Sequence, residues 1–228
     1  MATSRWWVDL SWPIREGFGE LPGHPPTRLE PFHRHETHGR SNVYLSMSIH
    51  SSTHLDAPYH FYPNGATVDQ LPLDALCCPA LLLDLGGEVA PGAAIERQQL
   101  QQQLALLGAP DVRGRALVIR TGWAEAKYGG IDYYTENPYL SADAAQWLAT
   151  TGAHLVGIDF PPDAIGKQMV IPAPSPVHEA LLGAGVCILE NLANLEKLPE
   201  KSFELLCLPL KLRGEGGAPA RALARSLL

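Results

Sequence analysis

The sequence lacks any apolar run long enough to span a membrane as a helix. Its first residues also lack the apolar core of a secretion signal, so we expect a cytoplasmic protein. Basic residues are outnumbered, since 17 lysines and arginines stand against 24 aspartates and glutamates, which gives a net charge of −7. This charge argues against nucleic acid or an anionic membrane as a partner and favours a small-molecule substrate.

Cysteine is also scarce. The four cysteines lie at positions 77, 78, 187 and 207, and no two of them have the spacing of a CxxC pair. Their arrangement argues against a zinc site built from cysteine. Cys187 and Cys207 lie in apolar runs, where we expect each free thiol to pack as a small hydrophobic group.

What the chain does contain is the composition of an ordinary globular protein, with 46% hydrophobic and 18% charged residues. Its 228 residues can form one sizeable core, so we expect a single domain over 1–228. Apolar periodicity predicts an α/β fold in which strands and helices mix along the chain. Strands are predicted at 6–12, 43–50, 79–85, 116–120, 154–159, 186–189 and 203–212, and helices at 93–107, 141–151 and 175–183. Residues 17–41 are predicted to form a long loop, and 213–221 a glycine-rich turn before a basic tail.

The densest group of chemically reactive side chains lies within residues 50–60, which hold His50, His54, Asp56 and His60. Imidazole and carboxylate groups are the usual ligands of zinc and similar divalent ions. A polar loop with surface histidines is the simpler alternative. Three histidines and an aspartate directly after a patterned strand instead favour a metal site.

The strand before this cluster alternates between apolar and polar residues, which predicts that one of its faces packs on a core. The four candidate ligands share the polar parity. Four residues of extended chain span about 13 Å, however, whereas the ligands of one metal lie about 2 Å from it. The chain must therefore turn sharply just after His50. Ser51, Ser52 and Thr53 suit such a turn because their hydroxyl groups hydrogen-bond to nearby backbone.

Two residues far along the chain are candidates for completing the site. Glu190 follows the apolar strand at 186–189, and an ionised carboxylate is costly to bury there unless it is paired or binds a metal. His178 lies in the first turns of an amphipathic helix that Ser175 is expected to cap. The alternative is a solvated Glu190 just past the strand end and a His178 outside any site. The histidines of the 17–41 loop, at positions 24, 33, 35 and 38, are expected to be exposed or to face a substrate.

Residues 50–60 resemble the HxGTHxDxPxH signature of the cyclase family of metal-dependent hydrolases. That family includes bacterial kynurenine formamidases, isatin hydrolases and proteins named after polyketide cyclases. One position departs, since Ser52 stands where the family has glycine, and backbone angles open to glycine can cost a serine about 1 kcal/mol or more. Three later stretches are similar to the family's GIDxxSPD, H…LL…GVxIxENLxNL and PLKLxGxxGSPxRA motifs; they begin at Gly157, His178 and Pro209. The resemblance covers nearly the whole chain.

The resemblance implies a central barrel-like mixed sheet flanked by helices, a homodimer or homotetramer, and two divalent metal ions, either zinc or manganese. The first ion would be held by His50, His54 and Asp56. The second would be held by Asp56, His178 and Glu190, with both carboxylates bridging. His60 would bind no metal and would act as the general acid and base.

These features predict a metal-dependent hydrolase of a small amide or cyclic amide, with N-formylkynurenine as the first candidate substrate, cleaved to kynurenine and formate. The alternatives are a lactam or lactone hydrolase like the isatin hydrolases, a polyketide-type cyclase, and a non-catalytic binding protein with a structural metal. A structural zinc site is normally closed by four ligands. An additional histidine, His60, instead favours an open and reactive site.

The substrate contacts are the least defined part of the prediction. In kynurenine formamidases a tryptophan before a Pro-Gly pair contacts the aryl substrate, and Leu21 stands at that position here. Stacking on an aryl ring is thereby weakened. Phe61 and Trp123 are the aromatic residues expected to contact the substrate in its place.

Overall fold

The main sheet of the protein closes on itself to form a barrel. The computed structural model describes residues 5–87, 89–164 and 174–227. Within them, strands neighbour one another in the order β12-β11-β5-β7-β9-β10-β4, and β4 pairs again with β12, while β1 (Trp7–Asp9) adds to β12 from outside the ring. The bounds of the ring strands are β4 His54–Asp56, β5 Cys77–Asp84, β7 Ala116–Arg120, β9 Leu155–Ile158, β10 Cys187–Glu190, β11 Ser202–Pro209 and β12 Gly217–Arg225.

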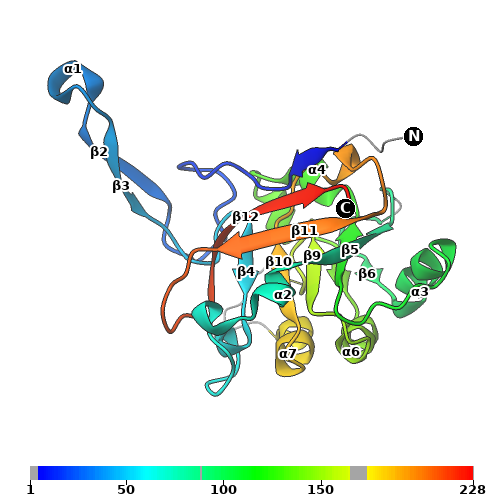
Figure 1. Cartoon of the computed structure of the whole chain (residues 1–228). Helices are drawn as coiled ribbons and strands as arrows, with labels where there is room; N and C mark the ends of the chain where they lie inside the picture. Colours follow the sequence, from blue (N-terminus) through cyan, green and yellow to red (C-terminus); the bar gives the residue numbers. More distant parts are fainter. Residues whose placement is uncertain (1–4, 88, 165–173, 228) are drawn as a thin grey trace.

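Strand directions and helix positions follow from how the strands are connected. β5, β7, β9 and β10 run parallel to one another, and the remaining pairings in the ring are antiparallel. Parallel strands need long crossovers, and helices α3 (Arg97–Leu106), α6 (Ala142–Thr150) and α7 (Pro176–Gly183) lie outside the barrel on these crossovers (Figure 1). This arrangement confirms the predicted α/β fold with a central barrel-like mixed sheet and flanking helices.

Shorter elements complete the body of the protein. A small two-stranded sheet pairs β6 (Ala94–Ile95) with β8 (Tyr139–Leu140). The short helices are α2 Leu73–Leu76, α4 Trp123–Lys127 and α5 Asp132–Thr135, and the 3-10 turns are Pro58–His60, Val68–Gln70 and Leu195–Lys197.

Two apolar cores lie on opposite faces of the ring. Alternate residues of β5 divide between them, since Ala80 and Leu82 face the barrel interior while Leu81 and Leu83 face the helices. A strand buried on both faces reads as a continuous apolar run, which is why the sequence predicts this strand well. The interior is narrow. A Cβ on Gly157 of β9 would lie 3.0 Å from a Leu192 methyl carbon, so a larger side chain there would require its neighbours to shift.

Several predicted boundaries are wrong, each for a physical reason. The helix predicted at 93–107 begins only after β6, because Glu96 and Gln99 form a capping box that starts α3 at Arg97. The segment predicted as a turn and basic tail forms β12. Its inward-facing residues are mostly alanine, which signals a strand weakly yet fills the narrow interior. Cys187 and Cys207 are free and buried, as predicted.

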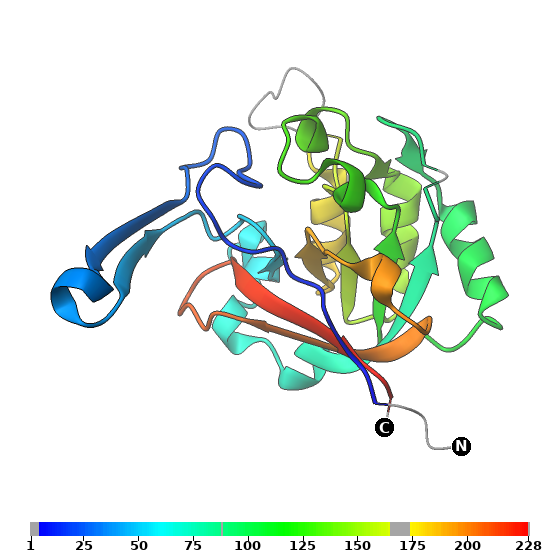
Figure 2. The same cartoon turned by 90° about the horizontal axis from the view of Figure 1, so that it is seen from above.

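The 17–41 segment contains the first half of a β-hairpin. β2 (Arg28–His33) pairs with β3 (Asn42–Ser46), and α1 (His35–His38) forms the turn between them. The hairpin extends away from the barrel in both Figure 1 and Figure 2. Every residue of β3 is exposed, so the prediction that one face of this strand packs on the core is wrong.

Candidate metal centre

The register between β4 and β10 brings the early and late parts of the predicted site together. Residues directly opposite in an antiparallel pair point to the same face of the sheet, and Glu190 lies opposite His54. Asp56 is two residues beyond His54 and therefore shares this face, while Leu55 between them points into the barrel. One face of two neighbouring strands thus carries three of the predicted ligands.

The turn predicted after His50 is present, and Ser52 is its critical residue. Ser52 has φ +59°, the left-handed conformation in which glycine is favoured. Its carbonyl accepts hydrogen bonds from His54 Nδ1 at 2.9 Å and from Asn191 Nδ2 at 2.8 Å. The turn brings His50 Nδ1 to 2.7 Å from Asp56 Oδ1. Serine therefore adopts the required backbone conformation, and the bond from His54 leaves its Nε2 facing the carboxylates.

His178 reaches the same point from helix α7. Its Nε2 lies 3.2 Å from Glu190 Oε1 and 3.5 Å from Asp56 Oδ2. Its Nδ1 lies 2.5 Å from Asp163 Oδ2. Ser175 makes no side-chain capping hydrogen bond, because the backbone N–H of Val177 donates to Asp163 instead, at 2.9 Å. The predicted serine cap is wrong, and Asp163 both caps the helix and orients the His178 ring.

His60 lies beside the carboxylates, at the end of the 3-10 turn Pro58–His60. Its ring stacks on that of His50, with centroids 4.0 Å apart. Burial, together with the nearby His50 and His178, lowers the pKa of His60 to about 4, although Asp56 opposes this shift. The ring is therefore neutral at pH 7 and can accept a proton.

The residues present fit a divalent cation. His50, Asp56 and His60 form one group, and His54, Asp56 and Glu190 a second, whose potential ligand atoms lie within 4.8 Å of one another. Asp56 is 1% exposed, yet its Oδ2 has no hydrogen-bond partner. A buried carboxylate oxygen without a partner is costly, and a metal ion would satisfy it. Because the first group contains His60, the expectation that His60 binds no metal stays a prediction.

The protonation of these groups follows from the same geometry. Burial opposes ionisation of Asp56, but His54, His50 and His178 surround it and hold its pKa well below the ordinary value. Burial likewise opposes protonation of His178, but the neighbouring carboxylates of Asp163, Asp56 and Glu190 raise its pKa well above the ordinary value. The site therefore favours cationic partners around its carboxylates.

A pocket opens onto this cluster, and its wall combines polar and apolar residues. Leu21 and Phe61, two of the three predicted substrate contacts, line it, and the Phe61 ring stacks on His178 with centroids 4.9 Å apart. His24, one of the histidines expected to be exposed or to face a substrate, also lines it. Sequence reasoning gave no substrate or site role to several other lining residues, among them Tyr134, Pro161, Pro162, Asp163 and Asn191. The sequence did contain a signal for a role of Asp163, because this residue ends the stretch that resembles the family motif GIDxxSPD.

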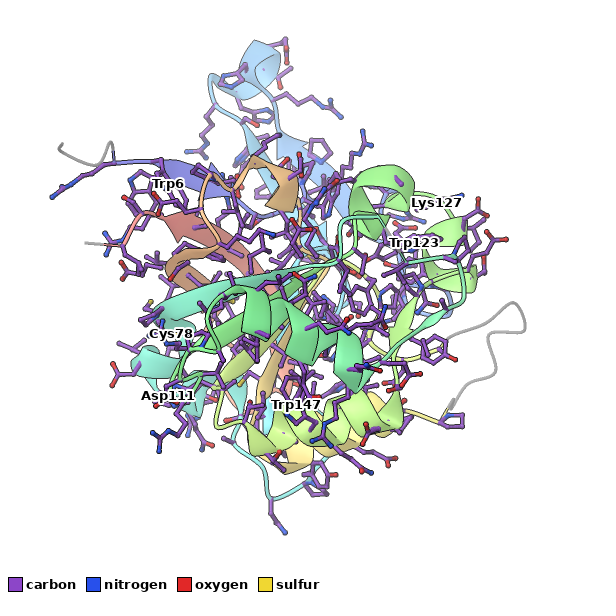
Figure 3. The ribbon with its side chains drawn as sticks, turned by 90° about the vertical axis from the view of Figure 1, so that its right-hand side faces the viewer. Trp6, Cys78, Asp111, Trp123, Lys127 and Trp147 are labelled. Atoms are coloured by element: carbon purple, nitrogen blue, oxygen red, sulfur yellow. The ribbon has the colours of Figure 1, made fainter. Side chains whose placement is uncertain are left out.

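Trp123 was wrongly predicted as a substrate contact. It is buried in the core cluster between the sheet and the helices, and its Nε1 donates to the Tyr133 carbonyl at 3.0 Å. Figure 3 shows it beside Lys127, whose Nζ lies 5.8 Å from the centre of the Trp123 ring. Its ring stabilises the α4–α5 region and does not line the pocket.

Comparison with known proteins agrees with this geometry. Residues 8–162 match the model of a family described as putative cyclase. The chain belongs to the cyclase family. It is 32% identical over 230 residues to a kynurenine formamidase of Bacillus cereus, and the match covers 100% of both chains.

Two solved structures are similar to this chain over almost their full length. An isatin hydrolase A from Labrenzia aggregata, bound to benzyl benzoate, has a TM-score of 0.84 and 27% identity, covering 97% of this chain and 94% of that one. A protein described as a predicted metal-dependent hydrolase from Bacillus stearothermophilus has a TM-score of 0.76 and 26% identity, covering 99% and 100%. These likenesses confirm the predictions of a metal-dependent hydrolase and of a divalent metal cofactor. No helix in the described part of the chain is long and apolar enough to cross a membrane.

The role of Asp163 can be tested without an activity assay. We expect Asp163→Asn to weaken metal binding by about 10–100-fold, because the neutral amide no longer fixes the His178 ring through a charged hydrogen bond. The affinity is measured by competition with a chromogenic chelator, and circular dichroism checks that the fold is retained. Asp143→Asn is the matched control, since Asp143 is an acidic residue in the first turn of α6, away from the site. Equal affinities of the two variants would refute the orienting role.

Proposed function

We propose that the chain is a metal-dependent amide hydrolase that cleaves an N-formyl arylamine such as N-formylkynurenine, releasing formate and the free amine. The observation that carries the proposal is the convergence of three histidines and two carboxylates at one end of a partly apolar pocket, with His60 beside them. The full-length similarity to a kynurenine formamidase supports this substrate class.

His50, His54, Asp56, His178 and Glu190 would hold the divalent metal, and this donor set is large enough for two ions. Mixed imidazole and carboxylate ligands suit both zinc and manganese. When bound, a divalent metal in such a site lowers the pKa of water toward about 7 and polarises a carbonyl group.

His60 supplies the proton transfers of the proposed reaction. Its neutral ring accepts the proton of the attacking water, and the same ring nitrogen then gives that proton to the leaving nitrogen as the C–N bond breaks. Stacking on His50 and contact with the Phe61 ring, whose centroid lies 4.9 Å away, hold its plane in place. Phe61 and Leu21 form the apolar wall against which the aryl part of the substrate would pack.

A lactam hydrolase is the second candidate, and the likeness to isatin hydrolase A favours it. Isatin is also an aryl amide, so the chemistry at His60 would be the same, but the product acid and amine would remain one molecule. Because Leu21 replaces an aromatic residue, this wall of the pocket does not favour one of the two substrates over the other.

A substrate screen with controlled metal content tests the proposal. The chain is stripped with a chelator, reloaded with Zn²⁺ or Mn²⁺, and assayed on an N-formyl arylamine, isatin and a simple lactone. We expect the highest kcat/KM on the N-formyl arylamine, with loss of turnover and retention of the far-UV spectrum after stripping. Highest kcat/KM on isatin would support the second candidate. Cooperative unfolding on metal removal, with no hydrolysis by the loaded protein, would indicate a structural metal instead.

A further inference from the structure

Tyr133 places a hydroxyl group in the apolar core cluster between the sheet and the helices, and the proposed reaction does not use this group. The residue lies in α5 and is fully buried, with 0% of its surface exposed. A phenylalanine would bury the same ring without the cost of taking a hydroxyl group out of water. The hydroxyl donates a hydrogen bond to Asn191 Oδ1 at 2.7 Å. This bond to Asn191 therefore accounts for a tyrosine at this position.

Asn191 directly follows Glu190 and joins the end of β10 to the turn of residues 51–53. It is 2% exposed and has φ +58°, a left-handed conformation that asparagine adopts more readily than most residues. Its Nδ2 donates to the Ser52 carbonyl at 2.8 Å, and its own carbonyl accepts from the Thr53 hydroxyl at 2.8 Å. Both the side chain and the backbone of Asn191 therefore hold this turn.

The hydroxyl of Tyr133 decides which way the Asn191 amide faces. A backbone carbonyl only accepts hydrogen bonds, so the amino group of the amide must point to Ser52 and the amide oxygen to Tyr133. Both ends of the amide are paired in this orientation. Without the hydroxyl, the buried Asn191 Oδ1 would lose its partner, and the amide would no longer be fixed.

The Ser52 carbonyl is shared with His54, whose Nδ1 lies 2.9 Å from the oxygen. Nδ1 must carry the ring proton to donate to that oxygen, so Nε2 stays unprotonated and free to bind a metal. Asn191 Nδ2 is 3.5 Å from His54 Nδ1, which is longer than either distance to the carbonyl, so both nitrogens donate to the same oxygen. The position of the Ser52 carbonyl therefore sets the tautomer and the direction of the His54 ring.

We propose that Tyr133 is a positioning residue of the metal centre. It acts through Asn191 and the Ser52 carbonyl, which hold His54 in its metal-binding tautomer and orientation. The backbone of Tyr133 is itself anchored, because Trp123 Nε1 donates to its carbonyl at 3.0 Å. Hydrogen bonds thus connect the α4–α5 region to a metal ligand on β4. This role rests on the metal centre of the proposed function, but it holds for either candidate substrate.

Metal affinity, measured by competition with a chromogenic chelator, tests the proposal on three variants. Tyr133→Phe keeps the ring, and we expect it to weaken binding by about tenfold, the effect of one buried hydrogen bond. Asn191→Gly removes the side chain and suits the left-handed backbone, and we expect a loss of about 10–100-fold. Because Tyr133 acts through Asn191, the double variant should bind no more weakly than Asn191→Gly alone, whereas independent structural effects would add.

Tyr134→Phe is the matched control for metal affinity. Tyr134 is the next residue of α5 and is 4% exposed, but its hydroxyl donates to the Gly19 carbonyl at 3.0 Å, outside this series of hydrogen bonds. It lines the pocket, so it is a control for metal affinity and not for turnover. We expect wild-type affinity in this variant, and circular dichroism checks that every variant is folded. Wild-type affinity in Tyr133→Phe, equal losses in both tyrosine variants, or additive losses in the double variant would overturn the proposal.

The ring nitrogens of His54 give a readout that needs neither metal nor substrate. Nitrogen NMR of isotope-labelled, chelator-stripped protein at about pH 9 distinguishes the two neutral tautomers, and His54→Ala assigns the signals by their absence. We expect the proton on Nδ1 in the wild type and a partial shift to Nε2, which lies 3.6 Å from Asp56 Oδ1, in Tyr133→Phe. An unchanged tautomer in Tyr133→Phe would overturn the proposal. A wild type that binds no divalent metal would refute the proposed function, and the His54 tautomer alone would then decide the role of Tyr133.

Discussion

Asp56→Ala is expected to lose its bound metal and its turnover together. Asp56 is the carboxylate at the centre of the site, with Oδ1 2.7 Å from His50 Nδ1 and 3.6 Å from His54 Nε2, and with Oδ2 3.5 Å from His178 Nε2. Its removal takes a ligand from both proposed ions. Metal affinity should therefore fall by more than the roughly 100-fold that the loss of an outer hydrogen-bond partner costs.

Elemental analysis after dialysis measures this effect, with Asp56→Asn as the variant of nearly equal shape. Asp69→Asn is the control, since Asp69 is a carboxylate beside Thr67 and Gly214, outside the candidate metal groups and the pocket lining. Both Asp56 variants should be metal-poor while the control keeps wild-type content. Wild-type metal content in Asp56→Ala would remove Asp56 from the ligand set.

His60→Ala, unlike Asp56→Ala, is expected to retain its metal while its turnover falls by about 10²–10⁴. The imidazole moves protons in the proposed reaction but is not needed to hold the ions. The pKa of His60 is lowered to about 4, mainly by burial, so the ring is neutral and able to accept a proton above that pH. The loss of rate should therefore be of similar size at every pH from about 5 to 8.

Metal content and kcat of the same preparation separate the two possible roles of His60. Its place beside His50 and Asp56 would also suit a ligand, and a metal-poor His60→Ala variant would assign it that role. His154→Ala is the matched control, because His154 is an exposed histidine just before β9. Full turnover in His60→Ala would refute a role in proton transfer.

The barrel and the site differ in how well the sequence predicts them. β5 and β7 are long apolar runs and were placed to within two residues, because burial on both faces leaves a continuous signal. β12 was missed because alanine suits a narrow barrel interior but carries little strand preference. The convergence of His54 with Glu190 depends on a strand register that local sequence does not specify. The cost of burying the Glu190 carboxylate and the family motifs made it a candidate, but neither gave the register.

The wrong predictions for β3 and Trp123 share one cause, which is that alternation and residue type do not say what will cover a side chain. The residues of β3 alternate like a half-buried strand, yet none of the described residues covers them and all five are exposed. Trp123 was expected in the pocket as an aromatic residue, but the helices pack over it. Asp163 caps the N-terminus of α7 and orients His178, and both are distant from it in sequence. Its role could therefore be recognised only from the fold.

The central claim is that a late carboxylate and an early histidine-rich turn hold divalent metal in common. The metal stoichiometry of the wild type and of Glu190→Gln, measured by elemental analysis on folded protein, tests it most directly. We predict two ions per chain in the wild type and at most one in Glu190→Gln, because Glu190 Oε1 lies 3.2 Å from His178 Nε2 and Oε2 lies 3.9 Å from His54 Nε2. A wild type that binds no divalent metal, or a Glu190→Gln variant with the same stoichiometry and affinity as the wild type, would contradict the claim.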